Sequence, residues 1–168
     1  MKYYAGIGSR ETPYHICEIM TAIAKRLSLL DYVCRSGGAD GADDAFEKGA
    51  DYKQIFLPWD GFNGRSVNGT SYIIPPYVEE YVFKYHPKPS SLSYAGKKLM
   101  SRNTYQILGL DLNTPVEFVL CWTKDGLASG GTGQAIRIAK DRRIPIFNLK
   151  TDIEKFSVYM TQTIMLTS

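Results

Sequence analysis

Residues 3–13 read YYAGIGSRETP, an apolar, strand-like run that ends in a tight glycine turn. Apolar side chains then recur through residues 13–30 at the i, i+3, i+4 and i+7 spacing of an amphipathic helix. Thr12 followed by Pro13 is a typical helix opening, because a capping residue precedes a proline in the first turn. This stretch therefore predicts a buried strand, a glycine turn and a helix, which form the first half of a βαβ unit.

The same order of elements recurs along the rest of the chain. Further apolar runs, most of which end at glycine or proline, predict buried strands at residues 32–35, 54–57, 116–122 and 144–149. Helical patterns are found at residues 42–50, 95–108 and 134–142, and in the tail beyond residue 150. Such alternation implies a parallel sheet with helices on both faces. We therefore predict one α/β domain over residues 1–168, with a doubly wound sheet of about five strands in the order 3-2-1-4-5.

An insert at about residues 59–91, after the third expected strand, has a different composition. It is rich in glycine, proline and aromatic residues, and it is too long for a plain connection in a compact domain. Its many aromatic side chains argue against disorder. We expect a folded excursion, and the sequence leaves open whether it covers the site or forms a subunit interface.

Composition narrows the classes of partner. A chain of 168 residues that is 44% hydrophobic is long enough for one full core. A net charge of +3 suits a phosphate-bearing ligand but is too small for a typical duplex-DNA binder. Three widely spaced cysteines and two histidines predict neither a disulfide framework nor a metal site. Without a signal-peptide pattern or a membrane-length apolar run, we expect a cytoplasmic protein.

Three glycine-rich loops, at residues 6–13, 36–43 and 123–133, follow predicted strands. Ligands of open α/β sheets bind at the carboxyl ends of the strands, and backbone N–H groups at helix starts attract anions. Ser9 offers a hydroxyl and Arg10 a planar set of donors for phosphate or carboxylate. Asp43 can accept a hydrogen bond from a ribose hydroxyl. For Asp40, simple capping of the following helix explains the residue as well as a ligand contact does. The sequence lacks the Walker phosphate loop and the GxGxxG fingerprint.

The ordered set Gly8-Ser9-Arg10, residues 36–43, Pro58-Trp59, Arg102-Asn103 and residues 130–133 resembles the SLOG superfamily. This Rossmann-like superfamily includes the DNA-processing protein DprA, the LOG phosphoribohydrolases and the YspA/YpsA-type proteins, and the resemblance is closest to the YspA-like branch. It covers about residues 3–149 apart from most of the insert. It implies a Rossmann-like fold, homo-oligomers and a site for a nucleotide or its derivative. Together, the loops and the resemblance give as candidate ligand-binding residues Gly8, Ser9, Arg10, Gly37, Gly38, Ala39, Gly41, Asp43, Arg102, Asn103, Gly130, Gly131, Thr132 and Gly133.

The catalytic pattern of the LOG branch is not preserved. LOG hydrolases carry PGGxGTxxE, whose glutamate takes part in N-glycosidic cleavage, but here Ser129 replaces the proline and Arg137 stands in place of the glutamate. Glu11 is the remaining acidic candidate, and it would serve as a general acid or base only if it were buried beside the ligand. An exposed Glu11 would merely suit the dipole of the following helix. Whether the protein is an enzyme stays open at this point.

Three functions follow in order of preference. The first is binding of a nucleotide-derived small molecule, ADP-ribose-like or a cyclic signalling nucleotide, in order to sense or sequester it without a further cofactor. The second is an N-glycosidase or phosphoribohydrolase-like enzyme. The third is DprA-like binding of single-stranded DNA, for which the insert supplies stacking aromatics but the basic residues are few: Lys84, Lys88, Lys97 and Lys98.

Overall fold

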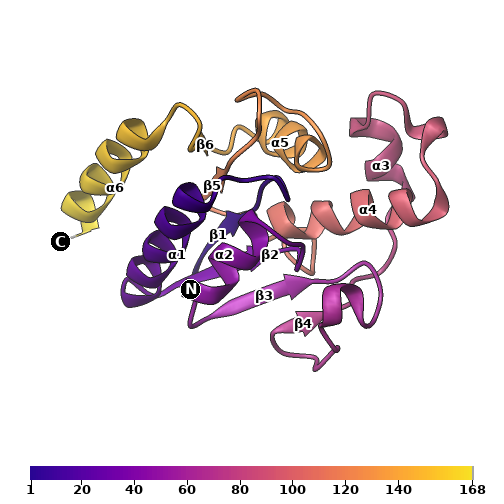
Figure 1. Cartoon of the computed structure of the whole chain (residues 1–168), viewed down its shortest axis with the longest axis horizontal. Coiled ribbons are helices and arrows are strands. Elements are labelled where there is room, and N and C mark those ends of the chain that lie inside the picture. The colour runs from indigo at the N-terminus through magenta and orange to yellow at the C-terminus, as the bar shows by residue number, and fades with distance from the viewer. Residues whose placement is uncertain (168) are drawn as a thin grey trace.

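The computed structural model describes residues 1–167, and they form a parallel six-stranded sheet with helices on both faces (Figure 1). The strand order is β4-β3-β2-β1-β5-β6. The strands are β1 (Lys2–Gly6), β2 (Tyr32–Ser36), β3 (Lys53–Phe56), β4 (Tyr72–Ile73), β5 (Phe118–Cys121) and β6 (Ile146–Asn148). The five strands expected from the sequence are present in the expected relative order.

The sixth strand, β4, departs from the expected sheet. It lies inside the insert and pairs in parallel with β3 at the sheet edge, with Ile55 opposite Tyr72 and Phe56 opposite Ile73. Its two residues make too short a run to be recognised by hydrophobic pattern. Its pairing depends on backbone bonds to β3 and the residue that follows it, such as the Leu57 N–H that donates to the Ile73 carbonyl at 2.8 Å.

The described helices correspond closely to the predicted ones, and the insert adds a short helix. They are α1 (Tyr14–Leu29), α2 (Ala42–Gly49), α3 (Glu79–Tyr85), α4 (Tyr94–Leu108), α5 (Thr132–Asp141) and α6 (Ile153–Thr167). The insert also contains 3-10 turns at Phe62–Gly64 and Pro89–Ser91. Among the described residues, none of these helices is long and apolar enough to cross a bilayer.

The predicted Thr12 cap of the first helix is wrong. Pro13 occupies the capping position, and no side chain caps α1. The Thr12 hydroxyl instead donates to the Ser9 carbonyl at 2.6 Å, within the turn after β1. A threonine hydroxyl can bond either to an N–H at the start of a helix or to a nearby backbone carbonyl. Here it bonds to the carbonyl within the turn.

Alternate residues of the central strands face two separate cores, as a sheet covered on both faces requires. Tyr4 of β1 and Phe118 of β5 pack against α1, α2 and α6. Ala5 of β1 and Val119 of β5 pack against α4 and α5. The two helical layers bury both faces of the sheet and leave the carboxyl ends of its strands as the place for a site.

Candidate functional site

A cavity of about 470 Å³ opens at the carboxyl ends of β1 and β5. The chain winds from β1 toward β2 on one side and continues through β5 and β6 on the other, so this is the point where strand order reverses. None of the described residues 59–91 lines this cavity. The candidate residues that line it are Gly8, Ser9, Arg10, Glu11, Ala39, Asp43, Arg102, Asn103, Gly130, Gly131 and Thr132. Gly37, Gly38, Gly41 and Gly133 lie outside its lining.

Hydrogen bonds around Ser9 fix the first loop. The Ser9 N–H donates to the Trp122 carbonyl at 3.0 Å, which joins this loop to the end of β5. The Ser9 carbonyl accepts from the Ala42 N–H at 3.3 Å, and its Oγ accepts from the Glu11 N–H at 3.0 Å. A Cβ on Gly8 would lie 2.6 Å from the Cβ of Ala42. Glycine at position 8 therefore lets the first loop pack directly on the start of α2.

The second loop packs closely against α4 because it carries glycine at position 37. A Cβ on Gly37 would lie 2.1 Å from Nη1 of Arg102 and 2.3 Å from Nε2 of Gln106. Gly38 and Gly41 have φ angles of 73° and 77°, a conformation that side chains rarely adopt. These glycines shape the loop behind the cavity wall, which is a structural role in addition to the phosphate contact that the resemblance implies.

Arg102 and Asn103 connect the second and third loops. Arg102 is 8% exposed, and its guanidinium donates to the Gly37 carbonyl and, at 3.0 Å, to Oδ1 of Asn103. Nδ2 of Asn103 donates in turn to the Gly131 carbonyl at 2.8 Å. The predicted Arg-Asn pair thus lies at the cavity and joins the two loops from α4.

Asp43 lies beneath this network and is 4% exposed. Oδ2 of its carboxyl accepts from the Ala39 N–H at 3.3 Å, so the side chain stabilises its own loop. Burial raises the pKa of Asp43, while the charge of Arg102 and backbone N–H groups partly oppose this rise. Burial also lowers the pKa of Arg102. Asp40, by contrast, does not cap α2, because Oδ1 of its exposed carboxyl accepts from Nδ2 of Asn63 in the insert at 2.9 Å.

The third loop is held by Asp125 and leads into α5. Oδ1 of Asp125 accepts from Oγ of Ser129 at 2.7 Å and from the Leu127 N–H at 2.9 Å. These hydrogen bonds lower the pKa of the Asp125 carboxyl. No side chain caps α5, so the amides of its first turn keep their attraction for an anion. The Gly133 N–H is already bonded to the Ser129 carbonyl at 2.9 Å.

Charged groups at the rim of the cavity are exposed. Arg10 and Lys124 bring two positive charges to the rim, and Glu11 brings one carboxylate. Glu11 precedes α1 rather than lying in its first turn. Arg137 points elsewhere: its Nε donates to the Tyr85 carbonyl at 2.6 Å and its Nη1 to the Ala128 carbonyl at 3.4 Å. Arg137 therefore supports the insert and the third loop.

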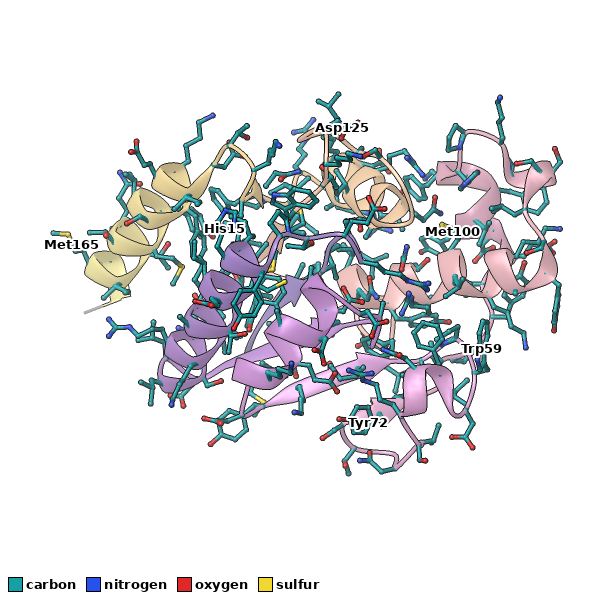
Figure 2. The ribbon with its side chains drawn as sticks, viewed as in Figure 1. His15, Trp59, Tyr72, Met100, Asp125 and Met165 are labelled. Carbon is teal, nitrogen blue, oxygen red and sulfur yellow. The ribbon has the colours of Figure 1, made fainter. Side chains whose placement is uncertain are left out.

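Several lining residues were not among the candidates. Leu99, Met100 and Gln106 come from α4, on or beside the face that carries Arg102 and Asn103. Figure 2 shows Met100 on the side of α4 that faces α5. Residues three or four positions apart share a helix face, so the spacing around Arg102 was the available signal. The others are Ile7, Thr123, Lys124 and Ser129, from the first and third loops. The described residues contain no cluster of His, Cys, Asp or Glu placed to hold a metal ion.

Of three comparisons with known proteins, the comparison with solved structures supports the fold. No protein-family model and no curated protein matches the chain. Among solved structures, it is similar to DNA processing protein A from Helicobacter pylori, with a TM-score of 0.57 and 16% sequence identity over 88% of this chain. The matched region is 64% of that protein's chain, and its structure is described for a single-stranded DNA binding mode. At this identity the likeness shows a shared Rossmann-like fold.

Proposed function

We propose that the protein binds a nucleotide in the cavity at the ends of β1 and β5, as a member of the SLOG superfamily and of its YspA-like branch. The carrying observation is that the first loop, the third loop and the uncapped start of α5 meet at the point where strand order reverses. Helix starts and open strand ends at such a point are the usual phosphate site of this architecture.

Each part of the cavity suits one part of a nucleotide. The phosphate would lie at Ser9 and at the amides of Gly131 and Thr132, with Arg10 and Lys124 supplying positive charge. Leu99 and Met100 would form an apolar wall for the base. A volume of about 470 Å³ is in the range of small-molecule sites.

A binding role is better supported than hydrolysis. The acidic candidate Glu11 is exposed, whereas a carboxyl that acts as general acid or base would have to lie buried beside the ligand. Arg137 is engaged with backbone carbonyls outside the cavity. The ligand would accordingly be sensed or sequestered, as an ADP-ribose-like or cyclic signalling nucleotide.

Single-stranded DNA is the second candidate, and the structural neighbour favours it. DNA processing protein A shares the fold and is described for binding single-stranded DNA. A strand would present the same phosphate chemistry to the same loops. Binding of a strand would weaken steeply with added salt, because several phosphates release counterions together, whereas a single nucleotide would show a shallower dependence.

Calorimetric titration with a panel of mononucleotides, ADP-ribose, cyclic nucleotides and short oligonucleotides tests this function. At least one of them should bind unchanged, and Arg10→Ala and Lys124→Ala should each weaken binding about fivefold or more. Lys25→Ala changes an exposed lysine of α1 outside the cavity and is the matched control. Absence of binding across the panel, or equal affinity in all variants, would contradict the proposal. Release of a base would restore the hydrolase alternative and direct attention to Glu11.

A further inference from the structure

A second cavity, of about 230 Å³, also lies at the carboxyl ends of the strands. Its walls include Leu57 and Pro58, which follow β3, and Ile74 and Pro75, which follow β4. Arg102 lines both this cavity and the main one. The two cavities are therefore neighbours at the carboxyl ends of the strands, and the buried side chain of Arg102 belongs to the walls of both.

Two exposed tyrosines flank the second cavity. Tyr94 is 73% exposed and Tyr77 is 44% exposed, although both line a concave surface. The ammonium group of Lys98 lies over one face of the Tyr94 ring, 4.7 Å from its centre. An exposed phenol ring with a cation over one face is suited to a flat aromatic base next to a negative charge, which is the chemistry of a nucleobase and its phosphate.

The frame around these rings is well held. The Val78 N–H donates to Oγ of Ser101 at 2.8 Å, and the Tyr105 hydroxyl donates to the Pro76 carbonyl at 2.6 Å. These bonds attach the segment that carries Tyr77 to α4 from both sides. Tyr94 is the first residue of α4, after Ser93, whose Oγ accepts from the Gly96 N–H. Both rings are therefore presented from fixed backbone.

We propose that this second cavity binds the base of a neighbouring nucleotide, so that the natural ligand contains at least two linked nucleotide units. This inference rests on the proposed function of the main cavity and extends it. A phosphate held at the glycine-rich loops would place the next unit of the same ligand past Arg102, toward Tyr77, Tyr94 and Lys98. A dinucleotide and a single strand share this chemistry, and ligand length distinguishes them.

The test compares thymidylate, the dinucleotide pTpT and hexathymidylate as ligands, with affinity measured at one fixed salt concentration. The wild type should bind pTpT more tightly than thymidylate. Tyr94→Ala should weaken pTpT and hexathymidylate about 5- to 100-fold, the range of base–aromatic stacking, and leave thymidylate within twofold. Tyr94→Phe keeps the ring and should restore affinity. The control is Tyr52→Ala, which removes an exposed tyrosine at the amino end of β3, away from the carboxyl ends where both cavities lie.

The outcomes separate this inference from the proposed function. If thymidylate binds but pTpT gains nothing, or if Tyr94→Ala weakens both equally, the second site is wrong and the main one stands. If no ligand binds the wild type, both fail. If Tyr94→Ala weakens hexathymidylate while Arg10→Ala does not, the second site stands and the main one fails. A further gain from pTpT to hexathymidylate identifies a strand, and no further gain identifies a dinucleotide.

Discussion

At the scale of residues, Arg102 and Asn103 determine the shape of the candidate site. Neither is exposed, and their hydrogen bonds join the Gly37 carbonyl on one side to the Gly131 carbonyl on the other. A buried guanidinium is stable only when its donors are satisfied, so the surrounding carbonyls and Asn103 hold it in one position. This explains why glycine occupies position 37, where any Cβ would meet Arg102 and Gln106.

Gly37→Ala should therefore weaken both folding and binding. The new methyl group would meet the ends of two flexible side chains, Arg102 and Gln106, so they would shift at a cost of about 1–3 kcal/mol in stability. Displacement of Arg102 should weaken nucleotide affinity about tenfold. Gly96→Ala, where the nearest atom is 3.3 Å away, is the control. Urea unfolding and calorimetry measure both effects, and unchanged affinity in Gly37→Ala would contradict the role given to Arg102.

Asp43 gives a pH dependence with a defined sign. Because its pKa is raised in the folded protein, the folded state holds the proton longer than the unfolded chain does. The contribution of Asp43 to the free energy of unfolding is therefore largest at low pH, and it falls as pH rises from about 4 through the raised pKa. The difference in unfolding free energy between the wild type and Asp43→Asn should move against the wild type over that range. Movement in the opposite direction would show that the Arg102 charge and the backbone N–H groups outweigh burial.

At the scale of elements, the insert is part of the sheet and a support for the second loop. Through β4 it extends the sheet beyond β3. Nε of Arg65 donates to Oε2 of Glu47 in α2 at 2.8 Å. Nδ2 of Asn63 donates to the Gly38 carbonyl at 3.1 Å. The insert thus holds α2 and the second glycine-rich loop from outside.

Arg65→Met should loosen this support. It would leave Glu47, which is buried, without its positive partner, and breaking such a pair costs about 3 kcal/mol. Limited proteolysis should then cut within residues 59–75 sooner than in the wild type. Lys48→Ala breaks the exposed pair with Asp44 and should change little, because water screens that pair. Equal stability and proteolysis in both variants would argue against an anchoring role for Arg65.

Local patterns account for what the sequence could predict. The five longer strands and the main helices follow from apolar runs and helical periodicity, which each segment carries within itself. The glycine-rich loops were visible for the same reason. By contrast, β4 exists because β3 offers a free edge, and Thr12 bonds Ser9 because the turn brings them together. Leu99, Met100 and Gln106 have ordinary residue types, so their place in the cavity depended on the rotation of α4.

At the scale of the whole molecule, the doubly wound strand order brings three loops that are distant in sequence to the carboxyl ends of the strands. Residues 8–11, Ala39 with Asp43, and residues 123–132 are far apart in sequence, and they line one cavity because parallel strands end together. The second cavity also lies at these carboxyl ends, which gives the molecule one continuous side for a ligand of nucleotide units. The fold shared with DNA processing protein A from Helicobacter pylori is compatible with this arrangement.

Amide chemical-shift mapping by NMR tests the central claim, which is that the loops after β1 and β5 hold the phosphate of a nucleotide. Isotope-labelled protein is titrated with a nucleotide that binds in the calorimetric panel, and the amide signals of Ser9, Arg10, Gly131 and Thr132 should shift. A second titration with inorganic phosphate at high concentration should shift the same signals more weakly. Amides at the amino ends of the strands, such as Tyr52, should stay in place. Shifts confined to residues outside the main cavity, or none at saturating ligand, would contradict the account.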